Sequence, residues 1–350
     1  MHRRTFLSHS VAALGLSTLV SAKDAALQTK VTAALDQGLG YLEKAQKPDG
    51  CWSSADYPGL TGLAVQAFLL APDAKYHGAA PVKNGLKFIR ASAKPDGGIY
   101  TRGLGNYNTS LALACLLRAG ESGDAALIEA ARKYLVHGQT SAGGFGYEAG
   151  GGRMGRPDLD NTVFALEALE LQRKAGRAQE RPGQQELDWK AAIDFVTRCQ
   201  SEKADPAEKG GFQYTPGADE KEAHSYGTMT YAGLLSLTYA EVPKDDARIK
   251  AAVSWLARRY TLEENPGQGQ EGLYYYYFVM AKGLTAAGID TLRKEDGTSV
   301  DWRPALAAKL LSLQKPDGSW SNNAGRWMEK DPVLATSYVA IALGLLRDRL

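Results

Sequence analysis

The feature that most constrains this chain is a short glycine-containing turn that returns along its length. Residues 46–52, Gln-Lys-Pro-Asp-Gly-Cys-Trp, return almost unchanged as residues 314–320. Weaker copies occupy 94–100, 143–147 and 210–214. Pro presets φ, Asp bonds nearby backbone and Gly accepts a positive φ, so each copy predicts a tight turn. A chain built on such a repeat is expected to fold as an array of similar units.

Two kinds of helical pattern flank each turn. The segment before a turn has apolar residues at helical spacing, as in Leu35, Leu39 and Leu42. The segment after a turn is more apolar throughout. Four of these following segments share a hydroxyl three residues before an alanine, at Thr61/Ala64, Thr109/Ala112, Thr162/Ala165 and Ser337/Ala340. Two more keep the alanine alone, at Ala232 and Ala281. We therefore predict six helix pairs, spaced by roughly 45 to 60 residues, in the range of helical repeats.

Paired helices of this kind stack into an open solenoid or close into a ring. A helix that is apolar on most sides has to be buried on most sides, so we predict a closed ring with the apolar helices inside. The stretches 150–156, 176–187 and 202–209 interrupt the pattern and are expected to be loops. The predicted fold class is all-α, an α/α toroid of six helix pairs that forms a single domain over residues 24–350.

The N-terminus has the features of an export signal. Arg3-Arg4-Thr5-Phe6-Leu7 precedes a weakly apolar stretch at 11–20, and Val20-Ser21-Ala22 provides a small-residue cleavage site. The arginine pair resembles a twin-arginine signal, and an ordinary secretory leader is the alternative. We predict that residues 1–22 direct export to the periplasm or the cell exterior. No other apolar run reaches the roughly 18 to 20 residues that span a bilayer, so no membrane span is predicted.

Charge and cysteine content narrow the possible partners. The 41 Lys and Arg residues against 39 Asp and Glu residues give a formal charge of +2. Without the two arginines of the leader the signs balance, which argues against nucleic acid or an anionic membrane surface as a partner. The three cysteines, Cys51, Cys115 and Cys199, show no C-x-x-C spacing. We predict no disulfide framework, no metal and no other cofactor.

The strongest candidate for chemistry lies at 157–169, where two carboxylates, Asp158 and Asp160, precede an apolar helical run. Paired carboxylates in a cleft are candidates for acid–base chemistry. The same residues offer a structural interpretation, because Asp160, Asn161 and Thr162 are all good N-cap residues at the start of such a run.

Comparing the repeats with one another separates these two interpretations. Asn108-Thr109 occupies the same frame as Asn161-Thr162, so we assign capping to the recurring Asn-Thr pair. The acids do not recur, and Tyr107 stands in the frame of Asp160. Because capping alone does not explain them, we predict Asp160 and Asp158 as the catalytic residues.

Further ligand contacts are predicted at the same rim. His224 and Tyr226 precede the fourth apolar helix, and His224 could bond an acid or act as a general base. An exposed loop histidine is the alternative. In the aromatic run 274–278 only one or two rings can face a cavity, because successive residues turn by roughly 100°; we choose Tyr277. The predicted ligand-binding residues are His224, Tyr226, Tyr107, Asn108, Asn161 and Tyr277.

The turn Gln-x-x-x-Gly-x-Trp at 46–52 and 314–320 resembles the repeat of squalene–hopene and oxidosqualene cyclases, and more distantly that of protein prenyltransferase β-subunits. The resemblance covers essentially all of the chain after the leader. It implies an α/α toroid whose inner helices surround a cavity. In those families the turn braces the outer helices against one another, and the resemblance implies this role for Gln46, Trp52, Gln314 and Trp320.

Class II terpene cyclases carry Asp-x-Asp-Asp-Thr at the start of an inner helix, and residues 158–162 match it except at Asn161. In that family the middle Asp protonates an alkene, which implies this role for Asp160 with Asp158 as its partner, and an apolar small molecule as ligand. The sequence has about half the length of the two-domain cyclases, so the resemblance implies a single toroid without the second domain that closes their active site. Two alternatives stay open: a carbohydrate-active enzyme that uses the same acids, and an exported, non-catalytic toroid that binds a ligand or a protein.

Overall fold

The computed structural model describes residues 22–149, 155–176, 186–217 and 224–350. The predicted export signal lies outside the described residues except for Ala22, which begins the first helix. Most of the loops predicted at 150–156 and 176–187 also lie outside them. The stretch 202–209 is described and contains no helix, as predicted.

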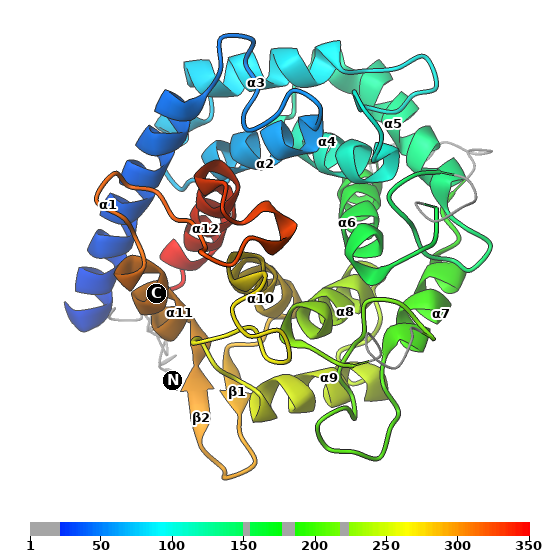
Figure 1. The fold of residues 1–350 in the computed structure, drawn as a ribbon, viewed down its shortest axis with the longest axis vertical. Coiled ribbons are helices and arrows are strands. Elements are labelled where there is room, and N and C mark those ends of the chain that lie inside the picture. The colour runs from blue at the N-terminus through cyan, green and yellow to red at the C-terminus, as the bar shows by residue number, and fades with distance from the viewer. Residues whose placement is uncertain (1–21, 150–154, 177–185, 218–223) are drawn as a thin grey trace, which may run out of the picture.

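Twelve α-helices alternate between an outer and an inner ring in the described part of the chain (Figure 1). The outer helices are α1 (Ala22–Ala45), α3 (Ala80–Ala91), α5 (Ala125–Gly138), α7 (Trp189–Cys199), α9 (Ala247–Arg258) and α11 (Trp302–Ser312). The inner helices are α2 (Pro58–Leu69), α4 (Gly105–Ala119), α6 (Leu159–Gly176), α8 (Gly227–Tyr239), α10 (Leu273–Ala287) and α12 (Pro332–Arg347). Each inner helix packs on the next, and α12 packs on α2, so the ring is closed. The fold is the predicted α/α toroid.

Burial explains why the two rings form from different sequences. In α8 every residue from Gly227 to Leu237 is buried, because outer helices cover its back and other inner helices its sides. In α7 only Ala192, Phe195, Val196 and Cys199 are buried, which is a single helical stripe. No helix among the described residues has the length and apolar character needed to cross a membrane.

Short elements fill the connections. A hairpin of β1 (Thr291–Arg293) and β2 (Ser299–Asp301) pairs antiparallel, with Thr291 opposite Asp301. It lies between α10 and α11 and was not predicted, because it has no counterpart in the other repeats. Three 3₁₀ turns complete the described elements: η1 (Ala74–Tyr76), η2 (Ser122–Asp124) and η3 (Arg326–Met328).

The repeated turn is a brace between neighbouring outer helices. A Cβ on Gly143, whose φ is +90°, would lie 2.0 Å from the carbonyl oxygen of Ala191 at the start of α7, so only glycine fits. In the last copy, Gln314 Nε2 donates to Gly318 O at 3.0 Å and to Ala34 O in α1 at 2.9 Å. This pair of bonds joins the last repeat to the first and closes the outer ring. The expected bracing role of the turn is confirmed.

The shared hydroxyl of the inner helices also serves the turn. Thr162 Oγ1 accepts the backbone N–H of Phe145 at 3.0 Å, and the same bond recurs in four other repeats. The five hydroxyls are those of Thr61, Thr109, Thr162, Thr230 and Thr336. The sequence alignment was therefore wrong by one residue at Ser337, whose neighbour Thr336 makes the bond, and it missed Thr230.

Candidate active site

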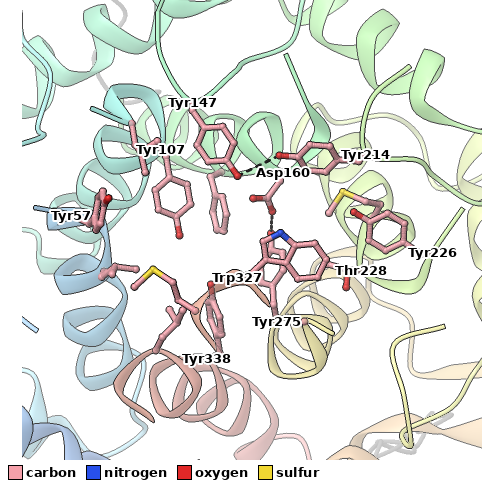
Figure 2. Close-up of a pocket in the computed structure, with 17 residues that line it drawn as sticks. Tyr57, Tyr107, Tyr147, Asp160, Tyr214, Tyr226, Thr228, Tyr275, Trp327 and Tyr338 are labelled. Carbon is pink, nitrogen blue, oxygen red and sulfur yellow. Dashed lines mark hydrogen bonds between the residues drawn. The ribbon is translucent and has the colours of Figure 1, made fainter. Parts of the chain in front are cut away.

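A cavity of about 230 Å³ opens at the end of the ring where the inner helices begin. All six inner helices contribute to its wall, and most of the wall is aromatic (Figure 2). Asp160 is the single carboxyl-bearing residue among the lining residues, all of which are described. The aromatic lining residues are Tyr57, Tyr107, Tyr147, Phe164, Tyr214, Tyr226, Tyr275, Trp327 and Tyr338.

Asp160 lies in the first turn of α6, and its carboxyl group points into this cavity. The hydroxyl of Tyr275, from α10 across the ring, donates a hydrogen bond to Asp160 Oδ1. Phe164, one turn later on α6, stacks on the Tyr275 ring with centroids 6.0 Å apart. Asp160 is half-buried, and its carboxyl stays accessible because it faces the cavity.

Asp158 has a structural role that differs from the position of Asp160 in the cavity wall. It is 3% exposed and is absent from the cavity wall. Its Oδ1 accepts the backbone N–H of Asn161 at 2.7 Å, and its Oδ2 accepts Asn161 Nδ2 at 2.8 Å. Asp158 is therefore the N-cap of α6. The prediction that Asn161 and Thr162 cap this helix is wrong, since Asn161 is a donor to the cap and Thr162 braces the turn.

The electrostatics of the two acids are coupled. Burial, reinforced by the charge of Asp160, raises the pKa of Asp158 to about 8. Burial also raises the pKa of Asp160 to about 6, although the bond from Tyr275 opposes the shift. Near neutral pH the two carboxyls together hold one proton. Because the pKa of Asp158 is the higher of the two, this proton lies mainly on Asp158, and Asp160 takes up its own proton as pH falls through about 6.

Two predicted ligand contacts, Tyr107 and Tyr226, line the cavity together with Asp160. His224 is not part of the wall; its Nε2 lies 3.2 Å from Gln268 Nε2, and its ring lies 5.7 Å from that of Tyr226.

Three other predicted contacts are structural. Asn108 is buried and its Oδ1 accepts Gly59 N at 2.9 Å, which ties α4 to α2. Asn161 bonds Asp158 as described and does not reach the cavity. Tyr277 is fully buried and donates to Leu262 O at 2.6 Å, so its assignment to the cavity is wrong. Tyr275 is the ring that faces the cavity, because two residues turn a helix by roughly 200°.

Comparison with known proteins places this fold. Residues 6–272, more than half of the chain, match the family described as the prenyltransferase alpha-alpha toroid domain. The chain belongs to this family. It is 26% identical over 158 residues to alpha-onocerin synthase LCD from Lycopodium clavatum, a match that covers 38% of the chain and only 20% of that enzyme.

Solved toroids from two enzyme classes share the fold. A variant of the type II terpene cyclase MstE from Scytonema, in complex with geranylgeranyl dihydroxybenzoate, superposes with a TM-score of 0.61 at 13% identity, covering 93% of this chain and 100% of that one. An inactive variant of the α-1,6-mannanase GH76A of Salegentibacter, in complex with α-1,6-mannotriose, gives 0.61 at 8% identity, covering 91% and 99%. These superpositions establish the toroid fold. At identities this low they do not show which reaction, if any, this chain catalyses.

Several wall residues of this toroid were not predicted from sequence. Tyr147 and Tyr214 each follow two residues after the Phe of a degenerate turn copy, and their hydroxyls lie 3.4 Å apart. Because both tyrosines occupy the same position in their turn copies, a comparison of the copies could have identified them. Trp327 and Met328 come from the loop before α12, whose sequence does not recur in the other repeats, so no sequence signal pointed to them.

Proposed function

We propose that this protein is a terpene-cyclase-like enzyme that protonates an alkene of a small isoprenoid with Asp160 and lets the product cation cyclise. One observation carries the proposal: the single carboxyl in an aromatic cavity has a pKa that burial raises to about 6, so it keeps its proton to a higher pH than an exposed aspartate does. A general acid has to hold its proton until the substrate alkene reaches it, and burial supplies that condition.

The chemistry is balanced without a cofactor. The Asp160 O–H adds its proton to a terminal C=C bond, whose electron pair forms the new C–H bond and leaves a carbocation. Internal alkenes attack this cation and form C–C bonds, and the final cation loses a proton to water. The product is an isomer of the substrate, and the acid regains a proton from solvent. Faces of rings such as Phe164 and Tyr338 stabilise the cations without bonding to them.

The lining also restricts the substrate. None of the wall residues is Lys, Arg or His, so the cavity offers no cation to hold a diphosphate. We therefore propose an uncharged isoprenoid, a hydrocarbon or an alcohol. Hydrolysis of a glycan is less well supported, because it requires two carboxyl groups that flank the bond, and Asp158 is buried behind the wall.

The test is turnover of a panel of uncharged isoprenoids, from geraniol and farnesol to squalene, followed by mass spectrometry of cyclised products. Wild-type protein should cyclise at least one, and Asp160→Asn should lower turnover by at least about 10³-fold, since general acids contribute up to roughly 10⁴. The Asn variant should unfold at nearly the wild-type temperature. Cyclisation that persists in Asp160→Asn, or an absence of cyclised product from the whole panel, would refute the proposal.

A further inference from the structure

One part of the cavity wall is unlike the rest. Trp327 and Met328 belong to the loop 321–331 between α11 and α12, and both line the cavity. They are 41% and 45% exposed and are the exposed large hydrophobic side chains of the described residues. Figure 2 shows the Trp327 ring over the cavity, in front of Tyr275. The loop therefore covers part of the mouth with side chains that solvent still reaches.

The same tip is strained. Trp327 and Met328 have φ values of +54° and +62°, in the left-handed region that non-glycine residues rarely occupy. Leu104, on another part of the wall, has a φ of +52°. Three of the five positive-φ non-glycine residues among the described residues thus line this one cavity. Strain of this kind gathers at ligand clamps and switch regions, where the surrounding structure holds it.

The loop also supplies the cap of the helix that carries Tyr275. Helix α10 begins after Gly272 and has no N-cap side chain of its own. Glu329, which is fully buried, takes that place: its Oε1 accepts Tyr275 N at 2.7 Å, and its Oε2 accepts Asn322 Nδ2 at 2.7 Å. A carboxylate at a helix N-terminus satisfies free N–H groups and favours the dipole. The first turn of α10 is therefore held by a different segment of the chain.

These contacts join the loop to the proposed acid. Trp327 rests on Gly272, where an added Cβ would lie 3.0 Å from its ring. Glu329 binds the backbone of Tyr275, and the Tyr275 hydroxyl binds Asp160. A displacement of the loop away from the mouth would release the α10 cap and with it the bond to the carboxyl.

We propose that Glu329 is a positioning residue for Asp160, and that the Trp327–Met328 tip closes over bound ligand and sets the Tyr275–Asp160 bond through Glu329. The positioning role rests on the proposed function, whereas closure of the tip over a ligand does not. Such coupling keeps the acid in place while the tip covers the cavity and water is excluded, which suits carbocation chemistry.

The positioning role is tested by kinetics with a matched cap variant. Glu329→Ala should lower kcat by about 100-fold, the size of effect expected when a reacting group is misplaced, with a smaller change in KM. Glu329→Gln keeps an acceptor oxygen and should recover most of kcat. Asp188→Ala removes the cap of outer helix α7, where Asp188 Oδ1 accepts Ala191 N at 2.8 Å, and should leave kcat unchanged. If Glu329→Ala lowers only the melting temperature, as Asp188→Ala does, Glu329 is a structural cap and the positioning role is refuted.

Closure is tested without turnover, in the Asp160→Asn background. Acrylamide quenching is measured with and without farnesol or squalene, and the Trp327 signal is obtained by subtracting the Trp327→Phe variant. Bound ligand should reduce quenching of Trp327 at least about threefold by closure of the tip, and Glu329→Ala should abolish this protection. Absence of protection across the panel would refute closure. Protection without any wild-type cyclisation would refute the proposed function and leave closure standing.

Discussion

Helix α6 carries two acids that face the ring interior in different surroundings, the half-buried Asp160 and the buried Glu167. Asp160 lies in its first turn, and Glu167 lies seven residues later, roughly 10 Å along the axis at 1.5 Å per residue. Around Asp160 the neighbours are aromatic rings and one tyrosine hydroxyl. Around Glu167 they are cations: Arg118 Nη2 lies 2.7 Å from its Oε1, and the ammonium of Lys282 contacts its Oε2.

The comparison shows that burial alone does not decide the charge of an acid. Burial raises the pKa of both carboxyls, but at Glu167 the charges of Lys282 and Arg118 outweigh it and lower the pKa. At Asp160 only a hydroxyl opposes burial, and the pKa stays raised. One acid is therefore a permanent anion that joins α4, α6 and α10, and the other is an acid able to give up a proton.

The largest expected effect comes from removing the permanent anion. Glu167→Gln should lower the free energy of unfolding by about 3 to 5 kcal/mol, because it leaves two cations without their buried partner. Asp160→Asn should cost less than about 1 kcal/mol, since the amide oxygen still accepts from Tyr275. Urea denaturation at pH 7 measures both. Adding Lys282→Met to Glu167→Gln should recover part of the loss; equal losses in the two single variants would contradict the comparison.

The fold could be predicted from the sequence because the residues that determine it lie close together in the chain. The turn copies encode a positive-φ glycine and a bracing glutamine within seven residues, and Gln46 and Gln314 behave alike. The local pattern could not show which of two adjacent residues on an inner helix faces the turn. Thr336 and Ser337 both carry a hydroxyl. Only the position of the turn 314–320 against α12 decides that Thr336 accepts the bond from Trp320 N.

The site was accessible only in part for the same reason. Asp160 stands out because it is absent from the other repeats, but choosing Tyr275 over Tyr277 required the start of α10, since each residue turns the helix by roughly 100°. The contacts around Glu167 join residues 49 and 115 positions apart, and no pattern in one sequence pairs them.

The next effect is a pH dependence of opposite sign at the two acids. The folded pKa of Asp160, about 6, is above its unfolded value, so its contribution to stability is present below the unfolded pKa and is lost as pH rises toward 6. Relative to wild type, Asp160→Asn should therefore gain up to about 3 kcal/mol between pH 4 and pH 7. Glu167 has a lowered pKa, so its contribution is present above the unfolded value and is lost at lower pH. Chemical denaturation of both variants across this range measures the two curves, and parallel curves would contradict the assignment.

The smallest effect is a shift of the pH–rate profile in Tyr275→Phe, a variant that loses the same Tyr275–Asp160 bond as Glu329→Ala and should show a similar fall in kcat at its optimum. Tyr275→Phe removes a donor that favours the ionised carboxyl, so the pKa of Asp160 should rise further, by about one unit for a bond to a charged group. Because the acid works when protonated, turnover should fall above its pKa, and the alkaline limb of the pH–rate profile should move up by the same amount. Tyr338→Phe is the control, since it keeps an aromatic ring in the wall and makes no hydrogen bond to Asp160. An alkaline limb that moves equally in both variants would show that the general polarity of the cavity, rather than the Tyr275 bond, tunes the acid.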